Sequence, residues 1–140
     1  MTSVHLDEIC RQNGSTLRSS LQEFYNSLFM TPFVVQESFD PSYVQYANGE
    51  TLEYPKFLQH IEHVRKTAKI IRYTVVDAIA YEGTIADRHM VSVETHDGST
   101  ATLEVLCLMH VKNGKIVQVN EMSRLANGEP ALSSLATATE

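Results

Sequence analysis

Two stretches in the second half of the chain decide its fold: YEGTIADRHMVSVETHDG at residues 81–98 and LMHVKNGKIVQVNEM at residues 108–122. In both, apolar and β-branched residues flank a pair of turn-forming residues. Asp-Gly and Asn-Gly pairs between apolar runs are strong hairpin signals. With Glu82-Gly83, Asp97-Gly98 and Asn113-Gly114 as turns, the pattern predicts four antiparallel strands, at residues 71–81, 85–96, 100–111 and 116–125.

The first half of the chain has a helical period instead. Apolar side chains recur at helical spacing, and Pro32 is suited to the first turn of a short helix. We therefore expect helices at residues 15–29, 32–39 and 54–69, with a short extended piece at 43–46.

Helices followed by an antiparallel meander predict an α+β fold. We expect this domain to cover residues 15–125, after an N-terminal extension at 1–14. The sequence becomes rich in Ala, Ser and Thr from residue 126, so we expect a mobile tail at 126–140.

Composition excludes several classes of function. The 140-residue chain has 11 Lys+Arg against 17 Asp+Glu, a formal net charge of −6, with no basic run to bind nucleic acid or anionic lipid. No apolar stretch approaches membrane-spanning length. The two cysteines, Cys10 and Cys107, are far apart, and Cys107 lies in an apolar run, so we expect a buried, reduced thiol in a cytoplasmic protein.

Counting across two-residue turns predicts which strand residues share a face. The members of the first face are His89, Leu106 and Glu121 in one row, and Asp87, Leu108 and Val119 in the next. The opposite face has a row of Val75, Met90, Val105 and Met122. Neither face is polar, so both need cover. The helices can cover one face, and a second copy of the protein is the simplest cover for the other, which predicts a homodimer through the outer face.

The first face holds the residues best suited to chemistry. Glu121 and His89 lie two strands apart, about 10 Å, so their side chains could flank a small ligand. Asp87, two residues before His89, could orient the imidazole. A carboxyl and an imidazole in an apolar cup suit general acid–base catalysis, because burial raises the pKa of the carboxyl. The alternative is that Glu121 and His89 hydrogen-bond each other or water.

Other residues are candidates for contact with a ligand. Tyr25 and Tyr46 could place hydroxyls in the cup, although packing in the aromatic core is the alternative. His110 falls on the predicted Glu121 face, near a hairpin end. The remaining predicted lining is apolar and includes Leu106, Leu108 and Val119. No phosphate-binding loop, Cys-x-x-Cys or nucleophile elbow is present, so we predict no cofactor and no metal site.

The order of elements, the segment FDPSYVQYANG at residues 39–49 and the run NGKI at 113–116 followed by Glu121 resemble the SnoaL-like branch of the nuclear transport factor 2-like superfamily. That group includes ketosteroid isomerases, polyketide cyclases and limonene epoxide hydrolase. The resemblance implies a cone in which N-terminal helices pack in the concave face of a strongly curved, mainly antiparallel sheet. It also implies that Glu121 enters an internal pocket.

The Arg-x-Asp pair associated with limonene epoxide hydrolase is missing, because the matching positions hold His89 and Val91. The resemblance and the candidate residues together favour a small-molecule pocket protein, with cofactor-independent acid–base chemistry on a small apolar carbonyl compound. Isomerisation, cyclisation and dehydration remain open. The alternatives are a non-catalytic ligand-binding protein and a protein-interaction module of the same fold.

Overall fold

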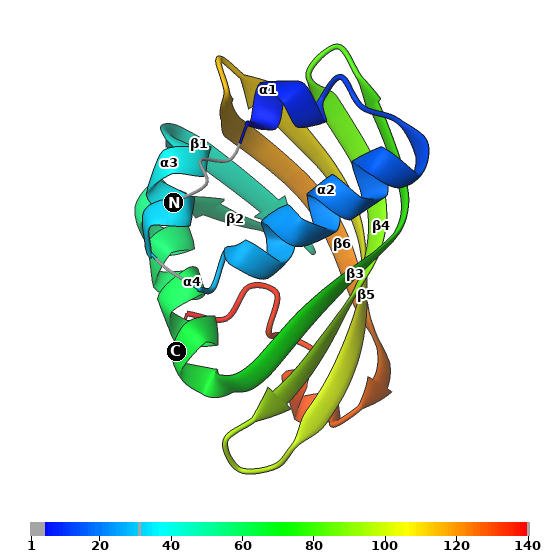
Figure 1. Ribbon diagram of the computed structural model, residues 1–140. Coiled ribbons are helices and arrows are strands. Elements are labelled where there is room, and N and C mark those ends of the chain that lie inside the picture. Colours follow the sequence, from blue (N-terminus) through cyan, green and yellow to red (C-terminus); the bar gives the residue numbers. More distant parts are fainter. Residues whose placement is uncertain (1–4, 31, 140) are drawn as a thin grey trace.

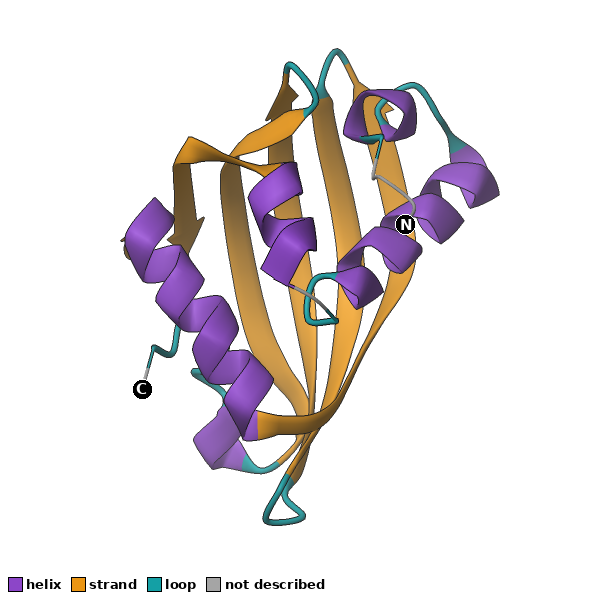
Figure 2. Cartoon of the chain, turned by 60° about the vertical axis from the view of Figure 1, so that its left-hand side comes forward, coloured by secondary structure: helices purple, strands orange, loops and turns teal. Residues whose placement is uncertain are grey.

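The chain folds into one curved six-stranded sheet with its helices on a single side. The computed structural model describes residues 5–30 and 32–139, and its strand order is β2-β1-β6-β5-β4-β3. Figure 2 shows the helices standing in front of the curved sheet. The strands are β1 (Phe39–Ala47), β2 (Glu50–Glu53), β3 (Ala68–Tyr81), β4 (Thr84–Thr95), β5 (Thr100–Lys112) and β6 (Lys115–Gly128). The helices are α1 (Leu6–Ile9), α2 (Gly14–Ser27), α3 (Pro32–Ser38) and α4 (Tyr54–Thr67), with a 3₁₀ turn, η1 (Pro130–Leu132), near the end.

The α+β class and the order of the long elements are confirmed. All the sheet pairs are antiparallel except β1 with β6, which run parallel and join β1 and β2 to the meander. Two short elements were not predicted, α1 and β2, because each is only four residues long and shows no period. No helix in the described part of the chain is both long enough and apolar enough to span a membrane.

Two of the three predicted tight turns are confirmed. Tyr81 pairs with Thr84 and Lys112 with Lys115, which leaves two-residue loops between them. The first loop residues have φ of 48° at Glu82 and 53° at Asn113, each followed by a glycine at positive φ. Positive φ at both central residues is the type I′ geometry, whose twist matches that of paired strands.

The turn between β4 and β5 has three residues, and the prediction of two is wrong. The Thr95 N–H donates to the Ser99 carbonyl at 2.9 Å, and the loop between them ends in Gly98 at φ 89°. The Asp97 carboxylate holds this loop, because it accepts from the Thr95 hydroxyl at 2.5 Å and from the Ser99 N–H at 2.9 Å. These bonds lower the pKa of Asp97 to about 2. A glycine after a turn of this kind is typical of three-residue hairpin loops.

Two strand irregularities also alter the predicted faces. The pairing of β3 with β4 shifts by one residue between Val75 and Asp77, and that of β5 with β6 shifts between His110 and Val111. A one-residue shift moves every later side chain to the other face. The irregularity in β5–β6 pairs Glu121 with Cys107, while the longer β4–β5 turn pairs His89 with Val105.

The longer β4–β5 turn shifts the pairing by one residue, and the irregularity in β5–β6 shifts it back. The residues of β6 that follow therefore keep their predicted faces, whereas those of β5 do not. Glu121 and Val119 consequently share the inner face with His89 and Asp87, as predicted, while the faces of β5 are reversed. Leu106 and Leu108 were predicted inside and are 57% and 46% exposed on the outer face. Val75 and Val105 were predicted outside and are buried among the core residues, while Met90 and Met122 do face outward, so the predicted outer row is wrong in part.

Helix α2 covers the inner face, and its side chains also hydrogen-bond to backbone groups at the edge of the sheet. Its buried side chains are Leu17, Leu21, Phe24 and Tyr25. On edge strand β3, the backbone of Tyr73 donates to Asn26 Oδ1 at 2.8 Å and accepts from Asn26 Nδ2 at 3.2 Å. The Val75 N–H donates to Gln22 Oε1 at 3.0 Å. These bonds fix the position of helix α2 along β3.

The C-terminal segment folds back toward α4, as Figure 1 shows. Strand β6 continues to Gly128, three residues beyond its predicted end. Leu135 is buried, and His60 Nδ1 on α4 donates to the carbonyl of Ala138 at 2.8 Å. The mobility of this tail stays a prediction.

Candidate functional site

A cavity of about 80 Å³ lies between the inner face of the sheet and the helices. Its volume corresponds to about three water molecules at about 30 Å³ each. Aromatic rings dominate the lining, and the described part of the chain contributes no Lys or Arg to it. The lining residues with polar side-chain atoms are Tyr25, Tyr43, Gln45, His60, Tyr73, His89, Cys107 and Glu121.

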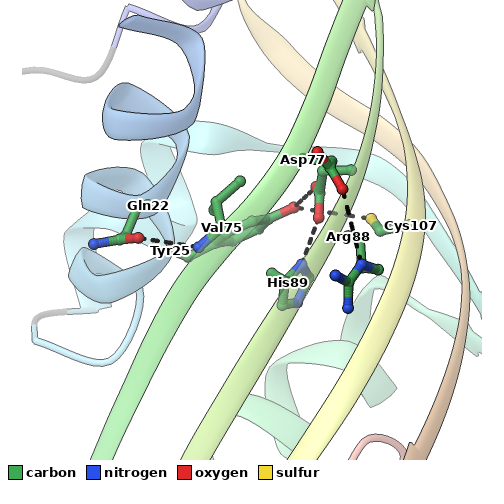
Figure 3. Close-up of polar contacts among 8 residues, drawn as sticks. Gln22, Tyr25, Val75, Asp77, Arg88, His89 and Cys107 are labelled. Carbon is green, nitrogen blue, oxygen red and sulfur yellow. Dashed lines mark hydrogen bonds and ion pairs between the residues drawn. The ribbon is translucent and has the colours of Figure 1, made fainter. Parts of the chain in front are cut away.

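One side of the cavity is formed by His89 and its buried partners. His89 Nδ1 lies 2.6 Å from Asp87 Oδ1, and the Tyr25 hydroxyl donates to Asp87 Oδ2 at 2.5 Å. Figure 3 shows Tyr25 reaching from α2 toward the strand that bears His89. A carboxylate only accepts hydrogen bonds, so the imidazole carries its proton on Nδ1. Nε2 is then the atom of His89 that can take up or release a proton.

The other side of the cavity is formed by Glu121 and residues of β1. Gln45 Nε2 donates to Glu121 Oε1 at 3.3 Å, and the Tyr43 hydroxyl donates to Gln45 Oε1 at 2.8 Å. The tyrosine bond fixes the orientation of the amide, because its oxygen is the only acceptor of that group. Gln45 therefore presents an N–H to the carboxyl of Glu121.

Adjacent strands place the acidic groups on both sides of a thiol. Asp87 pairs with Cys107, which pairs with Glu121, so the backbones of the two acidic residues lie two strand spacings, about 10 Å, apart along one row of the inner face. Burial raises the pKa of the Cys107 thiol well above its usual value, and the two carboxyls add to the rise. The thiol is therefore protonated and unreactive at neutral pH.

Glu121 has the pKa best suited to proton transfer. Burial raises it from 4.5 to about 7, His89 opposes the rise and Asp87 adds to it. A carboxyl with a pKa near the working pH can both accept and return a proton. The site thus holds a tunable acid–base group opposite a histidine.

The predicted site residues fall into two groups. The structure brings Glu121, His89, Tyr25 and Val119 to the cavity. Asp87 does not line it but bonds both His89 and the Tyr25 hydroxyl, so Tyr25 does not face open space. The structure does not bring Leu106, Leu108, Tyr46 or His110 there. Tyr46 and the two leucines line the outer face, and His110 Nδ1 contacts the Thr84 hydroxyl at 3.2 Å.

The sequence reasoning missed Tyr43, Gln45, Tyr73 and His60. The alternation in SYVQY, residues 42–46, could have shown that Tyr43 and Gln45 share a face, but it could not show which face. Tyr73 was hidden by the irregularity in β3. His60 is buried, and burial lowers its pKa.

The outer face of the sheet carries an open apolar hollow of about 780 Å³. Among its lining residues, Leu106 is 57% exposed, Ile79 72% and Met122 71%. Arg88 borders it and pairs with Asp77 at 3.9 Å and with Glu104 at 2.7 Å. This hollow is larger than the inner cavity.

Known structures share this architecture. AclR, a proposed hydroxylase from Streptomyces galilaeus, superposes with a TM-score of 0.68 at 14% identity, over 99% of this chain and 85% of that one. Wild-type IdmH, a proposed polyketide cyclase from Streptomyces antibioticus, gives 0.63 at 18% identity, over 84% and 91%. An NTF2-like protein of unknown function from Exiguobacterium sp. 255-15 gives 0.61 at 16% identity, over 73% and 92%.

The structure defines the chain as a protein of the nuclear transport factor 2-like fold. The resemblance found in the sequence is confirmed at that level. No protein-family profile matches the sequence, and no curated protein sequence matches it either. Because one fold hosts many activities, function has to be argued from the site.

Proposed function

We propose that the protein is a cofactor-independent acid–base enzyme that acts on a small carbonyl compound in the inner cavity. The observation that carries this proposal is the presence of Glu121, with a pKa of about 7, in one cavity with the His89–Asp87 pair. The similarity to a proposed polyketide cyclase supports the same class of chemistry.

In this proposal Glu121, as carboxylate, removes a proton from the carbon next to the carbonyl group. The electron pair of the C–H bond forms a C=C bond, and the carbonyl π electrons move to oxygen, which gives an enolate. Return of the proton by Glu121 to a different atom completes an isomerisation and restores the carboxylate. Cyclisation and dehydration would begin with the same proton transfer.

The burial of His89 and Asp87 supports this assignment. Asp87 is fully enclosed and accepts two hydrogen bonds, so it holds His89 in one tautomer and one orientation. Gln45, whose amide is held by Tyr43, likewise restricts the orientation of the Glu121 carboxyl. Both proton-transfer groups are therefore positioned before a substrate enters, which reduces the cost of reorganisation.

Hydrogen–deuterium exchange of small ketones in D2O, followed by NMR, tests the proposal. We expect the wild-type protein to catalyse exchange at the carbon next to the carbonyl, and Glu121→Gln to abolish it while retaining the fold. Glu50→Gln, an exposed change on β2, is the matched control and should leave exchange unchanged. Ligand binding without exchange in the wild-type protein would favour the non-catalytic alternative.

We also propose that two copies associate through the outer face of the sheet. The exposed Leu106, Leu108, Ile79 and Met122 gather around the apolar hollow, and covering them removes apolar surface from water. Leu106→Lys should split the dimer, because it would bury an unpaired charge. Light scattering at micromolar concentration measures this, and a monomeric wild-type protein would remove the idea.

A further inference from the structure

The inner cavity and the C-terminal end of the chain share one residue, His60 of α4. The His60 ring lines the cavity, while its Nδ1 donates to the carbonyl of Ala138 at 2.8 Å. Only 8% of His60 is exposed. A single buried imidazole therefore connects the cavity wall to the segment that follows the last strand.

That segment crosses from the sheet to α4. Strand β1 pairs with β6 only as far as Glu121, so the rest of β6, up to Gly128, has no strand paired with it on that side. Figure 1 shows the following part of the chain, in red, turning back toward α4. Leu135 joins the hydrophobic core on the way. We call residues 133–139 the C-terminal strap.

The C-terminal strap has few attachments to the rest of the protein. Among residues 5–30 and 32–139, the bond from His60 is its only hydrogen bond to an α-helix or a strand. Its other hydrogen bonds stay within the strap or return to η1. Leu135 is the one side chain of the strap that is buried. One apolar side chain and one hydrogen bond therefore hold the strap in place.

The helices around the cavity are attached more firmly. Helix α2 buries four side chains and makes three hydrogen bonds to β3, and α4 also buries four side chains. Segments with few buried contacts open locally at lower free energy than the core of the same protein, and lids over binding sites belong to this group. The strap is therefore expected to open while the sheet and the helices stay folded.

We propose that the C-terminal strap is a lid, which detaches from α4 and thereby admits small molecules to the inner cavity beside His60. Detachment breaks the bond to Ala138 and withdraws Leu135, so the His60 ring loses the contacts that hold it in the cavity wall. A lid of this kind excludes water from the site when closed. The inference concerns entry, and it applies equally to a catalytic and to a non-catalytic pocket.

Cys107 reports the opening, because this residue lines the cavity and is only 6% exposed. The probe is methyl methanethiosulfonate, a small uncharged thiol reagent, and mass spectrometry follows the labelling of Cys107 over time. Burial raises the pKa of this thiol, so labelling is run at pH 8.5. Labelling through local opening has a rate that low concentrations of urea leave unchanged, whereas labelling through global unfolding accelerates with urea.

Two variants weaken the two attachments separately. Leu135→Ala should speed the labelling of Cys107 at least about tenfold, because it removes most of the buried side chain. His60→Phe keeps a ring and removes the donor to Ala138, and should speed labelling about fivefold. Leu132→Ala, in η1 and only partly buried, is the matched control and should leave the rate unchanged. Circular dichroism checks that each variant is folded.

The outcomes separate this inference from the proposed function. Faster labelling in Leu135→Ala and His60→Phe, at rates independent of low urea, would support the lid. Unchanged labelling in both variants would overturn it, as would a wild-type rate that rises with the first additions of urea. None of these readouts depends on catalysis, so a working lid without exchange of ketones in D2O would contradict only the proposed acid–base activity.

Discussion

The raised pKa of Glu121 predicts a particular dependence of stability on pH. The folded protein holds a proton at this carboxyl up to a pKa of about 7, while an unfolded chain releases it near the ordinary value of 4.5. The stabilising contribution of the protonated form is therefore complete below pH 4.5 and is lost as the pH rises to 7. The difference between these two values corresponds to about 3 kcal/mol.

Glu121→Gln isolates this contribution, because the amide has nearly the shape of the protonated carboxyl and cannot ionise. Relative to the wild-type protein, the variant should gain about 3 kcal/mol of unfolding free energy between pH 4.5 and pH 8. His89 and Asp87 face the same carboxyl, and a cationic His89 would narrow the pH range of the gain. Urea denaturation of both proteins at intervals of one pH unit measures it.

Glu50→Gln, on the exposed surface of β2, controls for the loss of a negative charge as such. Its stability should run parallel to that of the wild-type protein over the same pH range. Parallel curves for Glu121→Gln would refute the reasoning, because they would show that this carboxyl titrates at the same pH in the folded and unfolded states.

Three further predictions concern the framework of the site. Gly128→Ala should destabilise the protein by about 2 kcal/mol or more in urea denaturation, because φ is 105° there and the new Cβ would overlap the backbone of β5. Gly98→Ala is the control and should cost less, because the added carbon has open space. Alkylation of the native protein followed by mass spectrometry should label Cys10 well before the buried Cys107, and rapid labelling of Cys107 would contradict its burial. Tyr25→Phe should cost about 2 kcal/mol of unfolding free energy, because a buried carboxylate loses a donor, and an unchanged urea midpoint would contradict that bond.

The sequence predicted the fold well because its strongest signals are local. Paired turn residues and helical periods are set by near neighbours in the chain, so the long helices and the meander were expected within a few residues of their observed ends. The short α1 and β2, and the parallel pairing of β1 with β6, depend on contacts between distant segments. No local pattern could show them.

The candidate site was predicted only in part, for a physical reason that concerns register. Glu121, His89 and Asp87 were correctly predicted to share one face because two one-residue shifts, the loop at Asp97 and the irregularity near Val111, cancel between β4 and β6. Leu106 and Leu108 lie between those shifts and were placed on the wrong face. Strand β5 is apolar on both sides, so a one-residue shift leaves its hydrophobic pattern unchanged. Composition therefore could not reveal the shift.

The bonds from Asn26 and Gln22 to strand β3 have a consequence for how this sheet can grow. An edge strand with free N–H and C=O groups is a template for a further strand from another molecule, and so for fibrous aggregation. In the middle of β3 a helix of the same chain already occupies those groups, and the opposite edge is the four-residue β2. Continuation of the sheet from molecule to molecule is therefore disfavoured at both edges.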